Sequence, residues 1–171
     1  MYLYFYTVKK ILLLSDTHSF IDDQILKYVN LADEVWHAGD IGNLRVTDTI
    51  KKHKPLRAVF GNIDGKEARA EFPLDLKFEE QGVKIWITHI GGYPNRYNQR
   101  VREALKANPP NLFICGHSHI LKVQYDNKLN CMHFNPGAAG KVGFHKVRTM
   151  LRFELDAGEI KNLEVIELAK R

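Results

Sequence analysis

Near its N-terminus the chain reads Ile11-Leu12-Leu13-Leu14-Ser15-Asp16-Thr17-His18. An apolar run of this length, bounded by polar residues, is typical of a strand that is covered on both faces, as strands of parallel sheets are. Asp16 and His18, two side chains able to bind a metal ion, follow this strand directly. Because ligands of open α/β sheets bind beyond the carboxyl ends of the strands, the segment predicts an α/β domain with its site at that edge.

Short apolar runs of the same kind recur along the chain and alternate with helical patterns. We expect further strands over residues 34–38, 57–60, 83–88 and 112–115, and helices over residues 21–31, 44–53 and 95–107. The remaining pattern is one of hairpins, which pair residues 74–78 with 83–88, 120–125 with 129–134, and 148–155 with 160–168. This succession predicts a layered α/β fold with a mixed sheet or two packed sheets.

The composition fits one ordinary domain. The chain has 171 residues, of which 44% are hydrophobic and 26% charged, and it contains no internal repeat and no linker rich in Pro, Gly or Ser. We therefore expect a single domain over residues 1–171. The formal net charge of +5 comes without a basic stripe, so nucleic acid is not an expected partner.

The compartment is predicted from the cysteines and the hydropathy pattern. Cys115 and Cys131 are the two cysteines of the chain, which argues against a disulfide scaffold and for a reducing compartment. No apolar run reaches the ~20 residues that a membrane span requires. We expect a cytoplasmic protein with no membrane partner.

Residues 1–8 allow two interpretations. They are apolar but lack the basic start and the small-residue cleavage site of a signal peptide. They are expected either to extend the first strand or to precede a true translation start near Val8. Tyr2, Tyr4 and Phe5 would either form an edge-strand contact in a homo-oligomer or pack onto their own chain.

Candidate metal ligands follow the ends of five expected strands. Besides Asp16 and His18, they are Asp40, Asn62, His89, His117 and His119. In extended backbone, a spacing of two residues would point each of the pairs 16/18 and 117/119 to one side, and the glycines at 39, 61 and 116 would permit tight turns. Because such a set would leave costly unpaired groups without a cation, it predicts a metal site.

The other histidines carry a simpler interpretation. His37 lies within an expected strand, where it is better interpreted as a satisfied core residue than as a ligand. His53 and His133 are expected to lie at the surface or in ordinary hydrogen bonds.

The order of these motifs resembles the calcineurin-like metallophosphoesterases, and most of all their small, cap-less YfcE-type members. The resemblance rests on Asp16-Thr17-His18, Gly39-Asp40, Gly61-Asn62-Ile63-Asp64, Thr88-His89, Gly116-His117-Ser118-His119 and Asn135-Pro136-Gly137-Ala138. It covers nearly the whole chain and implies a four-layer αββα sandwich, with two mixed β-sheets flanked by helices.

The resemblance also implies a site for two divalent metal ions. One ion would be held by Asp16, His18, Asp40 and His119, and the other by Asp40, Asn62, His89 and His117, with Asp40 as the bridge. Mn²⁺ is the expected metal, and Fe, Zn²⁺, Ni²⁺ or Mg²⁺ also fit a set without thiolate. The implied reaction is hydrolysis of a small phosphate ester, most of all a diester, by a metal-bridging hydroxide. Asp40, Asn62 and His119 are the expected catalytic residues.

The chain departs from the family pattern at two places on the substrate side. Ile63 stands where many members have a histidine, and Ile90-Gly91-Gly92-Tyr93 lacks a second histidine after His89. Without a positioned acid we expect activity on activated diesters and slow hydrolysis of alkyl phosphates. Asn62 and Arg96 are expected to bind the phosphate and Tyr93 to stack on a base, although Arg96 equally fits a solvated helix face.

Two other functions remain open. One is a nuclease, against which the small charge weighs. The other is a catalytically weak or silent protein-binding scaffold of the same fold, as in the small subunit of the retromer coat, whose metal site is degraded. The complete donor set favours the enzyme, and the missing histidine at Ile63 keeps the scaffold open.

Overall fold

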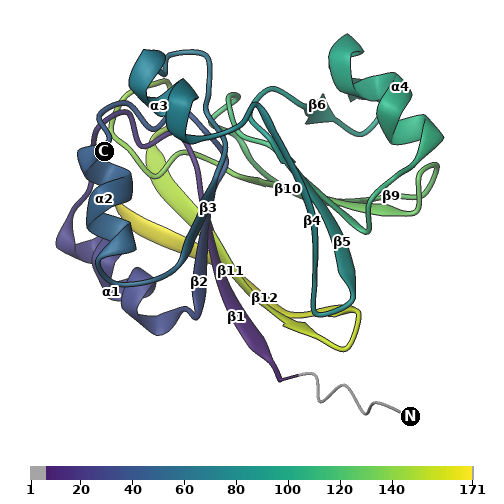
Figure 1. Cartoon of the computed structure of the whole chain (residues 1–171), viewed down its shortest axis with the longest axis horizontal. Helices are drawn as coiled ribbons and strands as arrows, with labels where there is room; N and C mark the ends of the chain where they lie inside the picture. The colour runs from purple at the N-terminus through teal and green to yellow at the C-terminus, as the bar shows by residue number, and fades with distance from the viewer. Residues whose placement is uncertain (1–6, 171) are drawn as a thin grey trace.

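The computed structural model describes residues 7–170 (Figure 1). Its helices are α1 (Asp23–Leu31), α2 (Arg45–Lys51), α3 (Lys66–Glu71) and α4 (Gln99–Ala107). Its strands are β1 (Lys9–Leu14), β2 (Glu34–His37), β3 (Leu56–Ala58), β4 (Asp75–Glu80), β5 (Val83–Thr88), β6 (Gly92–Tyr93), β7 (Arg96–Tyr97), β8 (Leu112–Ile114), β9 (Leu121–Asp126), β10 (Cys131–Pro136), β11 (Val147–Asp156) and β12 (Glu159–Lys170).

The strands form two five-stranded mixed sheets and one short hairpin. The first sheet has the order β12-β11-β1-β2-β3, with β1 parallel to β2 and antiparallel to β11. The second has the order β4-β5-β8-β10-β9, with β5 parallel to β8 and β8 parallel to β10. Strands β6 and β7 pair only with each other.

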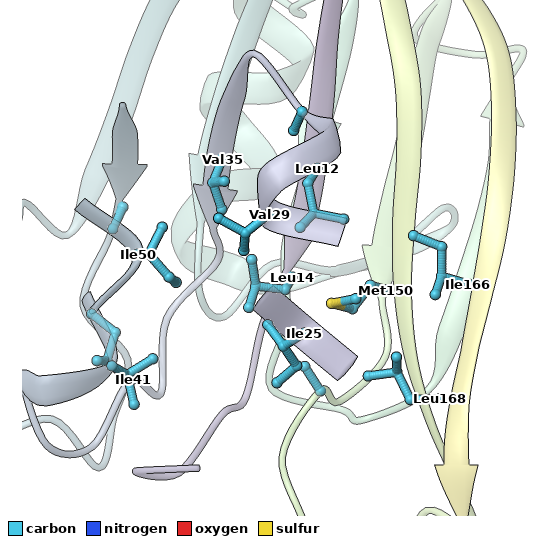
Figure 2. Close-up of a cluster of buried hydrophobic side chains, with 14 of the residues drawn as sticks. Leu12, Leu14, Ile25, Val29, Val35, Ile41, Ile50, Met150, Ile166 and Leu168 are labelled. Atoms are coloured by element: carbon cyan, nitrogen blue, oxygen red, sulfur yellow. The ribbon is translucent and has the colours of Figure 1, made fainter. Parts of the chain in front are cut away.

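The sheets face each other and the helices cover their outer sides, which confirms the predicted four-layer sandwich (Figure 1). Strand β1 shows how the apolar run produces these layers. Leu12 and Leu14 pack outward against α1 and α2 in the cluster of Figure 2, whereas Ile11 and Leu13 pack inward against the second sheet. Side chains alternate along a strand, so four consecutive apolar residues supply two interfaces at once. A third cluster joins α4 to the second sheet.

The layers bring the loops after the parallel strands to one edge. The N–H of Asp16, after β1, donates to the carbonyl of Gly39, after β2 (2.9 Å). In the second sheet the N–H of Gly116, after β8, donates to the carbonyl of His89, after β5 (3.0 Å). Backbone hydrogen bonds therefore hold these strand ends together independently of any side chain.

Two local predictions were wrong. Helix α3 was not expected, because only Ala68 of its residues is buried and no apolar periodicity marks it. Residues 95–98 do not belong to the helix predicted over 95–107. Asn95 turns the chain at a φ of 71°, and Asn98 caps α4 through the N–H of Arg100.

The β6–β7 hairpin was not expected either. The other differences are shifts of element ends by one or two residues, as hydrogen-bonded boundaries commonly show. Tyr2, Tyr4 and Phe5 lie outside the described residues, so their predicted contacts stay predictions. Within residues 7–170 no helix is long and apolar enough to cross a membrane.

Candidate metal centre

The seven predicted metal ligands lie in the loops that follow five strands. Asp16 and His18 follow β1, Asp40 follows β2 and Asn62 follows β3, all in the first sheet. The second sheet contributes His89 after β5, and His117 and His119 after β8. The structure brings these loops together across the two sheets as two groups of side chains.

The first group consists of Asp16, His18 and His119, whose ligand atoms all lie within 4.8 Å of one another. The Nε2 of His119 is 3.0 Å from Oδ1 of Asp16 and 3.4 Å from Nε2 of His18. Asp16 is fully buried, and among residues 7–170 its Oδ1 has no hydrogen-bond partner. A buried carboxylate oxygen facing two imidazole nitrogens without a hydrogen bond is suited to a cation.

The second group consists of Asp40, His89 and His117, again with ligand atoms within 4.8 Å. Nε2 of His89 lies 3.1 Å from Oδ1 of Asp40 and 3.1 Å from Oδ1 of Asn62, which adds the amide to this group. The Nδ1–H of His89 donates to the carbonyl of Ala38 (2.7 Å). This hydrogen bond fixes the ring so that Nε2 faces the oxygens, as outer partners of metal-bound histidines do.

Asp40 lies between the two groups. Its Oδ1 faces His89, and its Oδ2 is 3.7 Å from Nε2 of His18. Burial acts to raise the pKa of Asp40, but the neighbouring His89 imidazole and a hydrogen bond from the N–H of Ile63 outweigh it and lower that pKa. The carboxylate is therefore held ionised, with one oxygen available on each side.

The backbone of the ligand loops differs from the prediction. Extended backbone was expected at the paired ligands, but φ is 54° at Asp16, 46° at His18, 67° at His117 and 57° at His119. All four residues adopt the left-handed backbone conformation, which is uncommon for residues other than glycine. Non-glycine residues in this conformation cluster at functional sites. His117 and His119 consequently enter different groups instead of pointing to one side.

The glycines that were predicted to permit tight turns lie in close contact with the ligand residues. A Cβ on Gly61 would lie 2.3 Å from the backbone nitrogen of Asp40, and one on Gly39, at a φ of 94°, would lie 2.6 Å from Nδ1 of His89. Both contacts are shorter than atoms tolerate, so hydrogen is required at these positions.

Asp64 organises the ligand loops, a role that was not predicted from the sequence. Its carboxylate accepts hydrogen bonds from the N–H groups of Gly61 (2.7 Å), Ile41 (3.1 Å) and Gly42 (2.7 Å). It therefore ties the loop after β3 to the loop after β2, which carries Asp40. Its place in the Gly61-Asn62-Ile63-Asp64 motif was the available signal.

Arg69 and Asn135 support the loops in the same way and were also missed. The Nε–H of Arg69, on the unexpected helix α3, donates to the carbonyl of Asp64 (2.7 Å). The side-chain amide of Asn135 donates to the carbonyl of Gly116 (2.9 Å) and to Oγ of Ser118 (3.1 Å), next to the histidines of the β8 loop.

Of the other histidines, His37 agrees with the prediction and His133 does not. His37 is a satisfied core residue as predicted, since its Nδ1 accepts from Gly39 N–H (3.1 Å) and its Nε2–H donates to Thr17 (2.9 Å). Burial lowers the pKa of His37 to about 4. His133 was expected at the surface or hydrogen-bonded, but it is fully buried, and neither ring nitrogen has a partner among the described residues.

Two of the three predicted substrate-binding residues, Tyr93 and Arg96, lie on the β6–β7 hairpin, and the third, Asn62, lies in the loop after β3. Tyr93 is 40% exposed and lines a cavity with Ser118 of the β8 loop. Arg96 is exposed and lines a different cavity, to which none of the seven predicted ligands contributes. Its phosphate-binding role stays a prediction. Arg100, by contrast, bonds Asp75 (2.6 Å) and the hydroxyl of Thr88, and so anchors α4 beside the His89 loop.

The donor set fits divalent cations. The two groups offer carboxylate oxygens, imidazole nitrogens and one amide oxygen, without a thiolate. Such mixed oxygen and nitrogen sets suit Mn²⁺, Fe or Zn²⁺. The geometry agrees with the division of ligands implied by the resemblance, although which ions bind, and how many, stays a prediction.

Comparison with solved structures shows the same fold. A single-substitution variant of Vps29 from Entamoeba histolytica matches with a TM-score of 0.72 at 17% identity, over 94% of this chain and 99% of that chain. An archaeal phosphodiesterase matches with a TM-score of 0.71 at 22% identity, over 93% and 99%. Wild-type Vps29 from E. histolytica, complexed with Zn²⁺, matches with a TM-score of 0.66 at 17% identity, over 92% and 98%.

Sequence comparison identifies the family. No protein with a curated description matches significantly. The family model of the calcineurin-like phosphoesterase superfamily domain, however, matches residues 10–158, which include all seven predicted ligands and the strands that carry them. This protein therefore belongs to the calcineurin-like phosphoesterase superfamily.

Proposed function

We propose that this protein is a cytoplasmic phosphodiesterase that depends on two divalent metal ions. The observation that carries the proposal is the pair of donor groups that meet at Asp40. A bridging anion is what two dications held about 3.5–4 Å apart require. The two cysteines are free and buried, which supports a reducing compartment.

Each predicted ligand has a definite part in this proposal. When bound, a pair of divalent ions would lower the pKa of a shared water and stabilise negative charge on phosphoryl oxygens. Asp16, His18 and His119 would hold one ion, His89, His117 and Asn62 would hold the other, and Asp40 would be shared between them. Asn62 also lies beside Ile63, so its side chain is suited to orient a phosphate oxygen.

The substrate side lacks an acid where the family commonly has one. Ile63 is 48% exposed, and only its backbone N–H takes part in the site, through Oδ1 of Asp40. We therefore propose esters with leaving groups of low pKa as the preferred substrates. Mn²⁺ is the metal we propose, and the Zn²⁺-bound neighbour supports Zn²⁺ as the alternative.

A protein-binding scaffold is the second candidate, which the fold shared with Vps29 supports. A scaffold would have no need for the buried Oδ1 of Asp16, which has no hydrogen-bond partner among the described residues, or for the three ligand loops that Asp64, Arg69 and Asn135 hold. The complete donor set supports the enzyme over the scaffold, and the formal charge of +5 gives no support to a nuclease.

The test is hydrolysis of bis-p-nitrophenyl phosphate by chelator-stripped protein before and after Mn²⁺ is added. We expect activity in the wild type only with metal, and none above background in Asp40→Asn. Asp48→Asn, which changes an exposed carboxylate on α2, is the matched control and should behave as the wild type. Activity that survives chelation, or that Asp40→Asn retains, would refute the proposal.

A further inference from the structure

We propose that a cavity beside the metal centre is a subsite for a planar heteroaromatic group, a nucleobase, joined to the phosphate that is hydrolysed. The cavity is lined by Gly92, Tyr93, Ser118, Ile120, Lys122, His133 and Asn135. This inference rests on the proposed function, because it names the class of diester that the same site would take.

None of the seven predicted ligands lines the cavity, but its wall includes a residue of the ligand loop after β8. Ser118 stands in the chain between His117 and His119, and it is the lining residue nearest to them in sequence. The cavity lies along the outer face of the second sheet, where Lys122 of β9, His133 of β10 and Tyr93 of β6 line it. A substituent of a phosphate held at the metal centre would reach the cavity by extending past Ser118.

His133 gives the cavity its polar specificity. Its side chain is 0% exposed, its ring packs against those of Phe113 (5.9 Å) and Tyr97 (6.2 Å), and neither nitrogen has a partner among residues 7–170. A buried polar group without a partner is costly, which makes ligand or water atoms the expected partners. A neutral imidazole offers one N–H donor and one acceptor, and the edge of a nucleobase presents complementary groups.

The other walls suit a flat ring attached to an anion. Tyr93 presents an aromatic face and Ile120, 66% exposed, an apolar one. The ammonium of Lys122 lies 5.0 Å from the centre of the Tyr93 ring, where it adds a positive charge for a phosphate or carbonyl oxygen. Stacking on an aromatic side chain together with a nearby cation is how proteins hold single bases.

The size of the cavity limits the ligand. Its volume is about 240 Å³, below the ~300–1,000 Å³ of sites that enclose a whole drug-sized ligand. It has room for one ring system, so the rest of the diester must lie at the metal centre or in solvent. A mononucleotide ester fits this division, whereas two bases do not.

The test compares two diesters that share their leaving group. The p-nitrophenyl ester of thymidine 5′-phosphate carries a base, and methyl p-nitrophenyl phosphate does not. With Mn²⁺-loaded wild type we expect kcat/KM to favour the nucleotide ester by about tenfold or more, mainly through KM, as base stacking implies.

Two variants and two matched controls locate the effect. His133→Leu and Tyr93→Leu should each reduce the ratio of kcat/KM between the two esters at least about fivefold. Leucine at position 133 replaces an unpartnered imidazole among aromatic rings, so the variant should fold. His53→Leu and Tyr125→Leu, which change an exposed histidine and an exposed tyrosine outside this cavity, should leave the ratio unchanged.

A binding measurement separates failure of the subsite from failure of the proposed function. By calorimetry the wild type should bind thymidine 5′-monophosphate about tenfold more tightly than ribose 5-phosphate, and His133→Leu should lose this difference. Hydrolysis without any preference for the base, by either readout, would overturn the subsite alone. Absence of hydrolysis with the binding preference intact would uphold the subsite and refute the phosphodiesterase.

Discussion

Among single residues, Asp64 shows that the site also depends on side chains that would not bind the metal themselves. Its carboxylate accepts three backbone N–H groups from the two loops that carry Asp40 and Asn62. Asp64→Asn loses acceptor capacity and leaves at least one of these N–H groups without its partner. We expect Mn²⁺ affinity to fall about 10–100-fold, the range for outer-shell partners of metal ligands. Calorimetric titration measures this, and Asp48→Asn is the control; equal affinity in Asp64→Asn and wild type would contradict it.

In the proposed reaction, Ile63 leaves the site without an acid for the leaving group. Its side chain is exposed beside Asp40, while its N–H bonds that carboxylate in a way any residue could reproduce. Ile63→His would supply the missing acid and should speed hydrolysis of alkyl diesters at least about tenfold, with a much smaller change for p-nitrophenyl diesters. Ile63→Gln, polar but unable to transfer a proton, should not. An equal gain in both variants would show that polarity and not acid catalysis is responsible.

His133 makes folding stability depend on pH. Burial is the main reason that its pKa falls from 6.5 to about 4, with Lys122 lowering it further and Asp126 opposing. Between these values the unfolded chain binds a proton that the native chain does not, so the free energy of unfolding decreases as pH falls from 6.5 to 4. The lowered pKa of this one group accounts for a decrease of up to about 3 kcal/mol in the free energy of unfolding. Urea unfolding of His133→Leu should show a pH profile flatter by that amount, and parallel profiles would contradict the assignment.

Among the helices and strands, a contact between the N-terminal cap of α1 and strand β11 supports the loop that carries Asp16. Arg148 is buried, donates from Nε to the carbonyl of Ala139 (2.7 Å), and bonds Asp22 (2.9 Å), which caps α1 through the N–H of Ile25. The neighbouring Gly140 N–H donates to the carbonyl of Asp16 (3.1 Å). One guanidinium thus links a helix cap, a strand and a ligand loop.

We therefore expect Arg148→Met to lower the free energy of unfolding by about 1.5–3 kcal/mol, the value of a hydrogen bond to a charged group. Thermal unfolding should shift down by about 3–10 °C for a domain of this size. Arg152→Met is the matched control on the same strand. It breaks only an exposed ion pair with Glu164, worth at most about 1 kcal/mol. Similar losses in both variants would disprove the role of Arg148.

Sequence alone predicted the elements whose burial leaves a clear pattern. Strands β1, β5 and β8 are covered on both faces, and an apolar run such as Leu112–Ile114 is typical of a strand in that position. Helix α3 and the β6–β7 hairpin have few buried side chains, so their residues lack that pattern. Their form depends on hydrogen bonds between side chains and backbone, such as that from the side chain of Arg69 to the carbonyl of Asp64. The amino-acid composition of these segments does not indicate such contacts.

The candidate site was predictable in its members and not in its backbone. Ordered donors after successive strands identified all seven residues that the structure brings together. The left-handed conformations of Asp16 and His117 could not be inferred, because these residues hydrogen-bond to loops of other strands: the N–H of Asp16 to the carbonyl of Gly39, and the N–H of His117 to the carboxylate of Asp16. The same holds for His133, whose burial without partners among the described residues depends on packing against Phe113 and Tyr97.

For the molecule as a whole, two sheets that face each other explain why one site draws on both halves of the chain. The loops of the first sheet supply two carboxylates, one imidazole and one amide, and those of the second supply three imidazoles, so each donor group combines residues from both sheets. Figure 1 shows the two sheets facing each other. Membership of the calcineurin-like phosphoesterase superfamily supports the proposed chemistry, and the fold brings the donor residues together.

The most direct measurement of this account is the number of Mn²⁺ ions that chelator-stripped wild type binds, determined by calorimetric titration and checked by elemental analysis. The account predicts two ions per chain, and a clear reduction in Asp40→Asn, which removes the shared carboxylate. Binding of fewer than two ions by the wild type, or of two ions by Asp40→Asn with unchanged affinity, would contradict a centre built around Asp40.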